Sequence, residues 1–510
     1  MLSEIFGGKS EHPLASIKSA QALLKNLPKN DAYMSLMELT EWIESAAEQN
    51  DFKLDHQFAV ISLIDEAAQS YVRKLVREYF TPFEINKFQE NRLWLLLNNF
   101  SRHAAEAYYT VFNRYCNAEK GSIALKPQLP LLAARAVYAH ISQLKFVCSR
   151  YGQVDSSIWA NLARLYKHAE QLLYLDTPVN LYPGLTGNTT LKCELGHVLV
   201  WYDSGLSSLS HVYIHLTERI VAQYCSSVDI HSEISGNSRI FFDLNNPAEA
   251  SRINMDATTH PAMRFISMPT MQARVEELMK VLKKNIVPED LNLDGNFDAE
   301  VVMKAAQHLL NYLIAPPVRR SERRSANVTL NVVNSFEKVL DSSNTVQQFT
   351  HEKPARWVTE EISVGGFSSV LPKGSDGIGI GSLLGIQPDG MSHWGVAVVR
   401  RLLRDEHKNM HAGAEILAIQ VAAVSLNLNG KNSGDAQRAL WLYPKPGQAS
   451  GGDQLLLMGI DTYSPNRSLK IELDGKHYLL IPGGLQEKGL DYDLAKFKLI
   501  EQEFETDEGS

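Results

Sequence analysis

Four arginines lie within one six-residue stretch, Arg319-Arg320-Ser321-Glu322-Arg323-Arg324, which we call the arginine segment. The planar guanidinium of arginine pairs bidentately with phosphate or with the O6/N7 edge of guanine, and its flat face stacks on aromatic rings. The whole chain carries a net charge of −8. A cluster of cations in an acidic chain indicates a local binding site rather than a general affinity for nucleic acid. Its alternative is a solvated linker between two domains.

A second candidate set follows in Glu361-Ile362-Ser363-Val364-Gly365-Gly366. A serine hydroxyl can bond an anion, and glycines let backbone N–H groups approach a ligand closely. The carboxylate of Glu361 can accept hydrogen bonds from the N–H donors of guanine. The two sets together predict a site for a small guanine-containing phosphate ligand.

This pair of motifs resembles the PilZ domain, which carries R-x-x-x-R and then [DN]-x-S-x-x-G. Arg320-x-x-x-Arg324 fits the first motif, and Arg319-x-x-x-Arg323 is the other possible register. Glu361-x-Ser363-x-x-Gly366 fits the second, with Glu in place of Asp or Asn. Later strands of that family resemble residues 394–400 and 413–417. The connector between the motifs is longer than usual, which indicates an insertion near Ser342–Arg356.

The resemblance implies a bacterial receptor for cyclic di-GMP. It implies that the ligand contacts the arginine segment and the second motif, through Arg319, Arg320, Arg323, Arg324, Glu361, Ser363, Gly365 and Gly366. Cyclic di-GMP would be a ligand and not a cofactor. The sequence offers no catalytic constellation and no metal motif with complete ligand spacing, so we expect an effector without enzymatic activity.

Two other readings stay open. The departure at Glu361 and the long connector favour a protein-interaction scaffold whose barrel no longer binds nucleotide, because the extra methylene of Glu could crowd a guanine. A regulator that binds RNA or DNA through the arginine segment is a weaker alternative, because the chain is acidic overall.

The elements that must position these residues change type along the chain. Apolar residues recur at three- and four-residue spacing up to about residue 313, which predicts helices. The predicted helices are Asp31–Gln49, Asp55–Phe80, Lys87–Asn117, Leu129–Tyr151, Ser156–Tyr174, Leu191–Tyr224, Met271–Lys284 and Ala299–Leu313. Pro316-Pro317 would then form a stiff joint.

Beyond the prolines the period becomes two, which predicts a small antiparallel barrel. Asp474-Gly475, between two alternating runs, predicts a hairpin in a second β-unit. We therefore predict an α+β multidomain protein with a large helical N-terminal half. The predicted domains are 1–125 and 126–315 (helical, loop-rich at 225–269), 316–424 (PilZ-like barrel), 425–500 (second β-unit) and 501–510 (acidic disordered tail).

The remaining features predict a cytoplasmic protein. Cys116, Cys148, Cys193 and Cys225 lie in no C-x-x-C pair and are expected to be free thiols. We expect no signal peptide and no membrane-spanning segment. An unidentified protein partner would contact the helical half, and we expect neither a nucleic-acid polymer nor a membrane as partner.

Overall fold

The computed structural model describes residues 12–81, 85–184, 187–253, 258–315, 322–343, 353–375, 377–428, 437–444, 453–473 and 475–502. The chain divides into two compact units, Met1–Pro317 and Val318–Ser510. We call them the helical unit and the barrel unit, and each is described by itself. Arg319, Arg320, Pro316, Pro317 and residues 503–510 of the predicted tail lie outside the described residues, whereas Glu501 and Gln502, which were assigned to that tail, belong to a strand.

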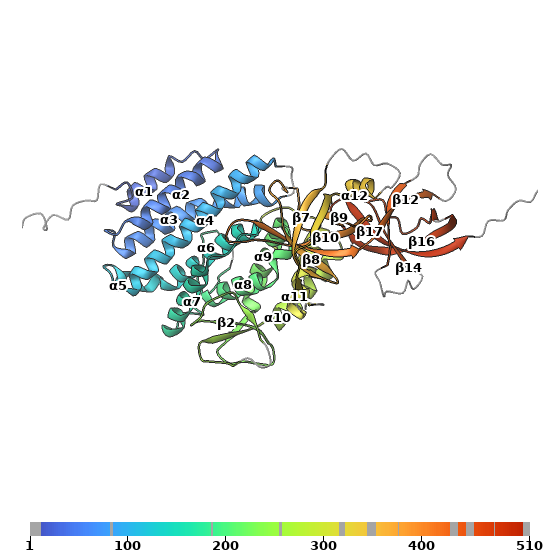
Figure 1. The fold of residues 1–510 in the computed structure, drawn as a ribbon. Coiled ribbons are helices and arrows are strands. Elements are labelled where there is room, and N and C mark those ends of the chain that lie inside the picture. Colours follow the sequence, from blue (N-terminus) through green and yellow to red (C-terminus); the bar gives the residue numbers. More distant parts are fainter. Residues whose placement is uncertain are drawn as a thin grey trace, which may run out of the picture. The chain divides into compact units, whose positions relative to one another are not determined.

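Helices make up most of the helical unit (Figure 1). They are α1 (Ile17–Lys25), α2 (Ala32–Glu48), α3 (Leu54–Phe80), α4 (Lys87–Cys116), α5 (Ser122–Leu125), η1 (Lys126–Gln128), α6 (Leu129–Ser149), α7 (Ser156–Gln171), α8 (Leu191–Asp203), η2 (Leu206–Ser208), α9 (His211–Tyr224), η3 (Cys225–Ser227), α10 (Pro269–Leu282) and α11 (Ala299–Ile314). Most of the predicted helices are confirmed within three residues at each end. Side chains cap several of them, because Asp31, Asn86 and Asp155 accept hydrogen bonds from backbone N–H groups in the first turns of α2, α4 and α7.

The single helix predicted over Leu191–Tyr224 is wrong, because the chain breaks between α8 and α9. Gly205 adopts a φ of 76° there, a left-handed conformation that favours glycine. A Cβ at Gly205 would lie 2.1 Å from the Tyr312 hydroxyl. The Tyr312 side chain of α11 therefore fills the space that a side chain at position 205 would need. Apolar periodicity continues through the break, which is why the sequence pattern missed it.

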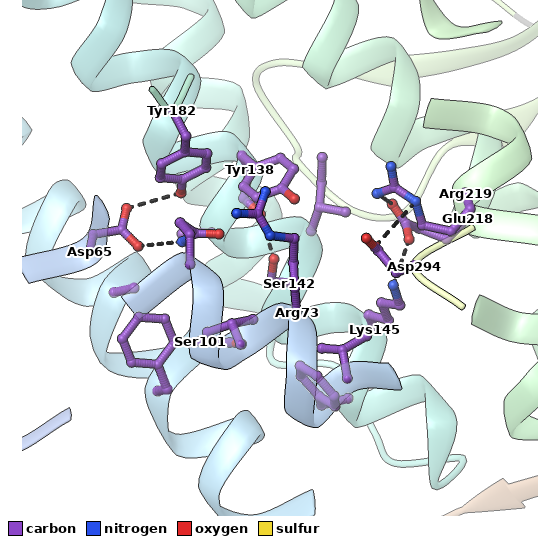
Figure 2. A pocket seen from close by; sticks show the side chains of 18 residues that line it. Asp65, Arg73, Ser101, Tyr138, Ser142, Lys145, Tyr182, Glu218, Arg219 and Asp294 are labelled. Atoms are coloured by element: carbon purple, nitrogen blue, oxygen red, sulfur yellow. Dashed lines mark hydrogen bonds and ion pairs between the residues drawn. The ribbon is translucent and has the colours of Figure 1, made fainter. Parts of the chain in front are cut away.

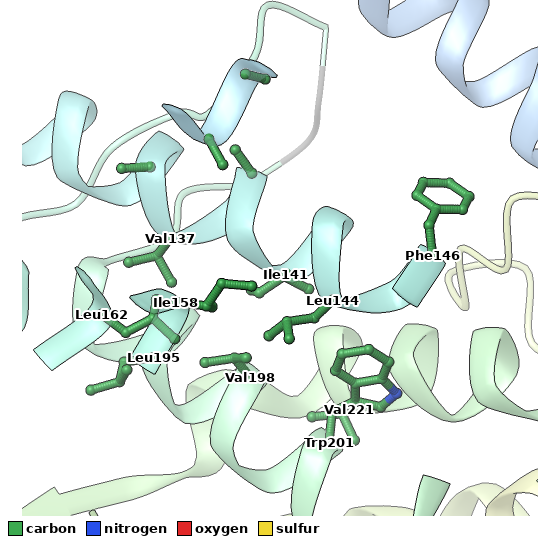
Figure 3. Packing of buried hydrophobic residues seen from close by; sticks show 14 of the residues in the cluster. Val137, Ile141, Leu144, Phe146, Ile158, Leu162, Leu195, Val198, Trp201 and Val221 are labelled. Carbon is green, nitrogen blue, oxygen red and sulfur yellow. The ribbon is translucent and has the colours of Figure 1, made fainter. Parts of the chain in front are cut away.

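One hydrophobic cluster runs through the helical unit, from Leu14 to Leu313. Figure 3 shows part of it, where α6 meets α7, α8 and α9. Ile141 and Leu144 of α6 face Val198 and Trp201 of α8 in this view. The cluster spans both predicted helical domains, 1–125 and 126–315, so residues of both domains belong to one core.

A small antiparallel sheet interrupts the helices after α9. It contains β1 (Asp229–His231), β2 (Ser238–Asp243), β3 (Ser251–Arg252) and β4 (Met263–Ser267), in the order β1-β4-β2-β3. Ile240 and Phe242 of β2 and Ile266 of β4 are buried in the helical core. The stretch predicted as loop-rich, 225–269, therefore carries a sheet that packs on the helices.

The expectation of four free thiols is wrong for two of them. Cys193 and Cys225 form a disulfide whose Cα atoms are 5.5 Å apart, while Cys116 and Cys148 are free. The pair joins the first turn of α8 to the residue after α9. The two cysteines are 32 residues apart, a separation that carries no short-range sequence signal.

The barrel unit begins with a closed six-stranded barrel (Figure 1). Its strands follow the order β7 (Ala355–Ser363), β6 (Thr329–Asn334), β9 (Leu383–Pro388), β10 (Gly395–Arg404), β11 (Met410–Ala418) and β8 (Gly366–Val370), and β8 pairs back with β7. A two-residue strand, β5 (Arg324–Ser325), adds to β7. The connector from β6 to β7 holds α12 (Phe336–Ser342), and residues 344–352 of the predicted insertion lie outside the described residues.

A second closed barrel follows. Its order is β12 (Val421–Leu428), β13 (Gln437–Leu442), β14 (Asp453–Gly459), β17 (Tyr492–Gln502), β16 (Lys476–Lys488) and β15 (Leu469–Leu473). The predicted hairpin at Gly475 joins β15 to β16. The predicted domain limit at residue 424 falls inside β12. The predicted fold class, a helical N-terminal half followed by β-barrels, is confirmed, and the second β-unit is itself a closed barrel.

The two barrels share a hydrophobic cluster. It combines Phe336, Val339 and Leu340 of α12 with Leu383, Val396 and Val398 of the first barrel and Leu440, Leu442, Leu457 and Leu494 of the second. The Arg400 guanidinium of β10 also forms a bidentate pair with Glu487 of β16, at 2.6 and 2.7 Å. The first barrel is therefore packed against the second and not connected to it by a linker alone.

Candidate functional site

The structure brings part of the arginine segment onto the second motif. β5 pairs antiparallel with β7, placing Arg324 opposite Ile362 and Ser325 opposite Glu361. The Ala326 N–H donates to the Glu360 carbonyl at 3.1 Å. Thr359, 2% exposed, donates its hydroxyl to the Ala326 carbonyl and accepts from the Val328 N–H. These bonds hold the end of the arginine segment against β7.

Alternation along the strand separates the two described arginines. Partners across a pair of strands point to the same face, and successive residues point to opposite faces. Arg323 therefore shares the face of Glu361, and its Nη1 lies 2.8 Å from Glu361 Oε2. Arg324 lies on the face of Ile362. The structure thus brings Arg323, and not Arg324, to Glu361.

The β7–β8 hairpin carries the rest of the second motif. Ser363 pairs with Gly366, so Val364 and Gly365 form the turn between the strands. The Ser363 hydroxyl donates to the Gly366 carbonyl at 3.2 Å, and Val364 at the tip is 86% exposed. Glu361, Ser363 and Gly366 lie on one face of the hairpin because they are two residues apart or directly opposite.

The two glycines have different structural roles. A Cβ at Gly366 would lie 2.3 Å from the Ala414 carbonyl oxygen, because β8 passes close to β11 there. Gly366 is thus required by barrel closure, whereas the sequence interpretation had assigned it to ligand approach. A Cβ at Gly365 would meet nothing within 4 Å, so Gly365 borders open space on that side, while its carbonyl accepts from the Ile416 N–H at 2.9 Å.

Charged residues that the sequence interpretation missed surround the hairpin. His411 of β11 binds Glu360 Oε2 through Nδ1 at 2.9 Å and Asp405 Oδ2 through Nε2 at 3.1 Å. Arg400 Nε binds Glu415, which is paired with Gly366 across the strands. The sequence signal for these residues was a polar side chain recurring among the apolar residues of β10 and β11. Only the pairing of the strands shows that these side chains lie beside the hairpin.

The helical unit holds a second concentration of charge, which is buried (Figure 2). Lys145 of α6 contacts Glu218 of α9 at 2.7 Å, and Glu218 also contacts His197 of α8 at 3.1 Å. All three side chains are less than 10% exposed. Burial alone would raise the pKa of Glu218, but Lys145, Arg219 and His197 hold this pKa well below its ordinary value. The carboxylate is therefore charged and locks three helices together.

A related group surrounds Asp65 of α3 (Figure 2). The Asp65 carboxylate accepts from Tyr108 at 2.6 Å, from Tyr182 at 2.9 Å and from Gln69 at 2.8 Å. Burial raises the pKa of Asp65, although the tyrosine bonds and Arg135 act in the opposite direction. Lys145 had a weak signal in the sequence, because it falls on the apolar stripe of α6 four residues after Ile141.

A cavity of about 340 Å³ opens beside these residues. Its lining includes Arg73, Tyr182, Thr189, Cys193, Glu194, His197, Arg219, Cys225 and Asp294. It is polar and carries both signs of charge. The sequence interpretation assigned no site to this part of the helical unit.

None of the helices in the described ranges combines the length and the apolar character needed to cross a membrane. No curated protein and no solved structure gives a significant match to the chain. A family model described as "Cyclic-di-GMP receptor FimW, N-terminal domain" matches residues 18–234, which run from α1 through β1 and end before the barrels begin. The helical part of this chain is therefore similar to the N-terminal domain of a cyclic-di-GMP receptor family.

Proposed function

We propose that this protein is a cytoplasmic effector that binds cyclic di-GMP on its first barrel and has no catalytic activity of its own. The observation that carries the proposal is the pairing of β5 with β7. Two motifs that are far apart in the sequence meet there, so that Arg323 lies beside Glu361 and Arg324 pairs with Ile362. The family match over residues 18–234 supports the same ligand independently, because it concerns the helical part.

The chemistry of the ligand fits this group of residues. Guanidinium groups bind phosphate oxygens or the guanine O6/N7 edge bidentately, and we assign this role to Arg319, Arg320, Arg323 and Arg324. Ser363 and the open side of Gly365 would contact the ligand from the hairpin. Glu361 would accept from guanine N–H groups, and Gly366 would keep the hairpin in place.

Binding must displace or share the ion pair between Arg323 and Glu361. The two side chains are 36% and 47% exposed. Exposed pairs of this kind contribute only about 0–1 kcal/mol, so a doubly charged ligand can compete for Arg323. The pair would hold the end of the arginine segment near the hairpin until the ligand replaces it.

The output is proposed to pass through the joint before the arginine segment. Ligand held by that segment would order the chain next to Pro316-Pro317 and favour one arrangement of the two units. The helical unit would provide the partner-binding surface, and the second barrel would brace the first through their shared core. Small-angle scattering should then show a ligand-dependent radius of gyration in the parent. A Pro316→Gly, Pro317→Gly variant should lose that dependence, and an unchanged response would make the joint a passive spacer.

A scaffold whose barrel does not bind nucleotide is the second candidate. Glu361 stands where the PilZ pattern has Asp or Asn, and it is already paired with Arg323. In this reading the ion pair closes the site, and the surface acts only in protein contacts.

Calorimetric titration of the full chain with cyclic di-GMP separates the candidates. We expect saturable binding of cyclic di-GMP and binding at least about tenfold weaker of cyclic di-AMP, which keeps the phosphates and lacks the guanine edge. Absence of cyclic di-GMP binding would favour the scaffold. A steep loss of affinity with salt for any oligonucleotide, without cyclic di-GMP binding, would indicate a nucleic-acid regulator instead.

A further inference from the structure

Cys193, Glu194 and Cys225 form a compact group in the helical unit, which we call the thiol–carboxylate cluster. Cys193 and Glu194 lie in the first turn of α8, where Thr190 caps the helix by accepting from the Cys193 N–H at 3.1 Å. Cys225 follows α9 directly. The two Sγ atoms and a carboxylate oxygen of Glu194 all lie within 4.8 Å of one another. Helix capping and the chain after α9 thus bring three metal-ligating groups to one point.

The carboxylate of the cluster is buried and held in place. Glu194 is 5% exposed and Cys225 is 6% exposed. Glu194 Oε1 accepts from the Thr189 hydroxyl at 2.7 Å, and Oε2 lies 3.4 Å from His197 Nδ1. Second partners of this kind fix the orientation of ligating carboxylates in metal sites. Thr189 and His197 therefore fix a buried carboxylate directly beside the two sulfurs.

Two thiolates and one carboxylate are a donor set that suits zinc. Zn–S bonds are about 2.3 Å and Zn–O bonds about 2.0–2.2 Å, so donor atoms around one ion lie within roughly 4 Å of one another. To meet this geometry the two sulfurs must separate after reduction, and the Glu194 oxygen, which lies within 4.8 Å of them, must come within about 4 Å. Sites with three protein ligands leave a fourth position for water or another small ligand.

The cavity of about 340 Å³ provides access to that fourth position, because all three members of the cluster line it. An ion can enter from the cavity without unfolding of α8 or α9, and a water can complete the coordination. We propose that the thiol–carboxylate cluster binds a divalent zinc-like cation in the reduced protein, and that the Cys193–Cys225 disulfide is the form that excludes it.

The two forms interconvert with a balanced exchange. A thiol reductant donates two electrons and two protons, its own sulfurs become a disulfide, and the Cys193–Cys225 bond becomes two thiols. Binding of the cation then releases both thiol protons, because thiolates are the ligands. Oxidation of the dithiol reverses the sequence and expels the ion. The helical unit would thus carry a cation site that depends on the thiol redox state.

Titration of the full chain with Co²⁺ tests this directly, because thiolate coordination gives a charge-transfer absorption band and tetrahedral geometry gives strong visible bands. We expect one equivalent of Co²⁺ to produce both in the reduced chain, and Zn²⁺ to abolish them. The oxidised chain should produce neither. This comparison uses one sequence and does not depend on a variant folding.

Three substitutions sharpen the test. Cys193→Ser should abolish the charge-transfer band, and Glu194→Gln should keep a thiolate band while weakening affinity about tenfold or more. Cys148→Ser, which removes a free buried thiol, is the matched control and should bind as the parent does. Absence of the band in the reduced parent, or a band that persists in Cys193→Ser, would overturn the proposal.

Discussion

In the helical unit, Lys145 and Glu218 are buried and pair with each other, whereas Arg323 and Glu361 on the first barrel pair at the surface. The buried pair is surrounded by further partners, and Glu218 alone contacts Lys145, His197 and Arg219. The surface pair stands beside an exposed hairpin tip and the open space at Gly365. The same kinds of charged side chain therefore have different roles in the two regions. A buried charge keeps fixed partners and stabilises the fold, whereas an exposed charge can exchange one partner for another.

The largest expected effect is on the buried pair. Lys145→Met should lower the free energy of unfolding of the helical unit by about 3–5 kcal/mol, because Glu218 would lose its nearest cation in the core. Urea denaturation followed by helical circular dichroism measures this change. Arg102→Ala removes an exposed pair with Glu106 and should cost less than about 1 kcal/mol. Equal costs for the two variants would remove the distinction between the regions.

The surface arginines should show the opposite behaviour. Arg323→Ala or Arg324→Ala should weaken cyclic di-GMP binding by about 2–4 kcal/mol, because charge-assisted bonds are lost. The free energy of unfolding should change by less than about 0.5 kcal/mol. Arg356→Ala is the matched control, since Arg356 lies on β7 and pairs with Asp389 at the surface. Unchanged affinity in both arginine variants would contradict the proposed site.

Gly365 and Gly366 of the second motif show the same contrast between an exposed position and a packed one. Gly366→Ala should destabilise the barrel unit by about 1–3 kcal/mol, because its Cβ would strike the Ala414 carbonyl oxygen at 2.3 Å. Gly365→Ala has open space and should leave stability within about 0.5 kcal/mol. Thermal unfolding of the two variants compares them. Loss of stability at Gly365 instead would show that the turn, and not the contact with β11, requires glycine.

Glu361 tests whether the surface pair or the ligand needs the carboxylate. Glu361→Gln should weaken cyclic di-GMP binding by about 1–2 kcal/mol, because a charged acceptor for guanine N–H groups becomes neutral. Glu361→Asp should preserve or improve binding, since Asp restores the PilZ pattern. Calorimetric titration of both variants shows whether the affinity for cyclic di-GMP falls or rises. Tighter binding by Glu361→Gln would mean that Glu361 competes with the ligand for Arg323.

The smallest expected effect is the pH dependence at His411. Burial alone would lower its pKa, but Glu360 on β7 and Asp405 after β10 raise it overall. A histidine with a raised folded pKa contributes stability that is present below its unfolded pKa of about 6.5 and is lost as the pH rises through the folded value. The parent should therefore lose stability relative to His411→Gln on going from about pH 6 to about pH 8. His407→Gln, at an exposed neighbouring position, should keep the dependence of the parent.

The sequence predicted those features that depend on local periodicity. α3 and α4 follow uninterrupted apolar stripes and end within one residue of the expected limits. The turn at Gly205 was missed because apolar residues keep the helical spacing through it, and the packing of Tyr312 against Gly205 from more than a hundred residues away leaves no local pattern. The disulfide was missed for the same reason, since only the packing of α8 on α9 brings Cys193 to Cys225.

The proximity of the two motifs was predictable from the sequence and their geometry was not, and the binding role of their residues stays a prediction. The motifs indicated that the arginine segment and the hairpin belong together, and β5 does pair with β7. Which arginine meets Glu361 depends on the register of that pairing, because a shift of one residue exchanges the two faces of a strand. The buried charges around Glu218 gave even less signal, because lysine and glutamate are ordinarily surface residues.

The hydrophobic cluster common to both barrels limits how this protein can change over evolutionary time. Val396 of the first barrel and Leu440 of the second belong to the same packed interior, together with Val339 of α12. A larger side chain at one of these positions requires a smaller one at another, because packed interiors tolerate little change in volume. The barrels are therefore expected to be inherited and exchanged as a pair. A chimera that grafts the ligand-contacting strands onto another protein must carry α12 and the second barrel with them.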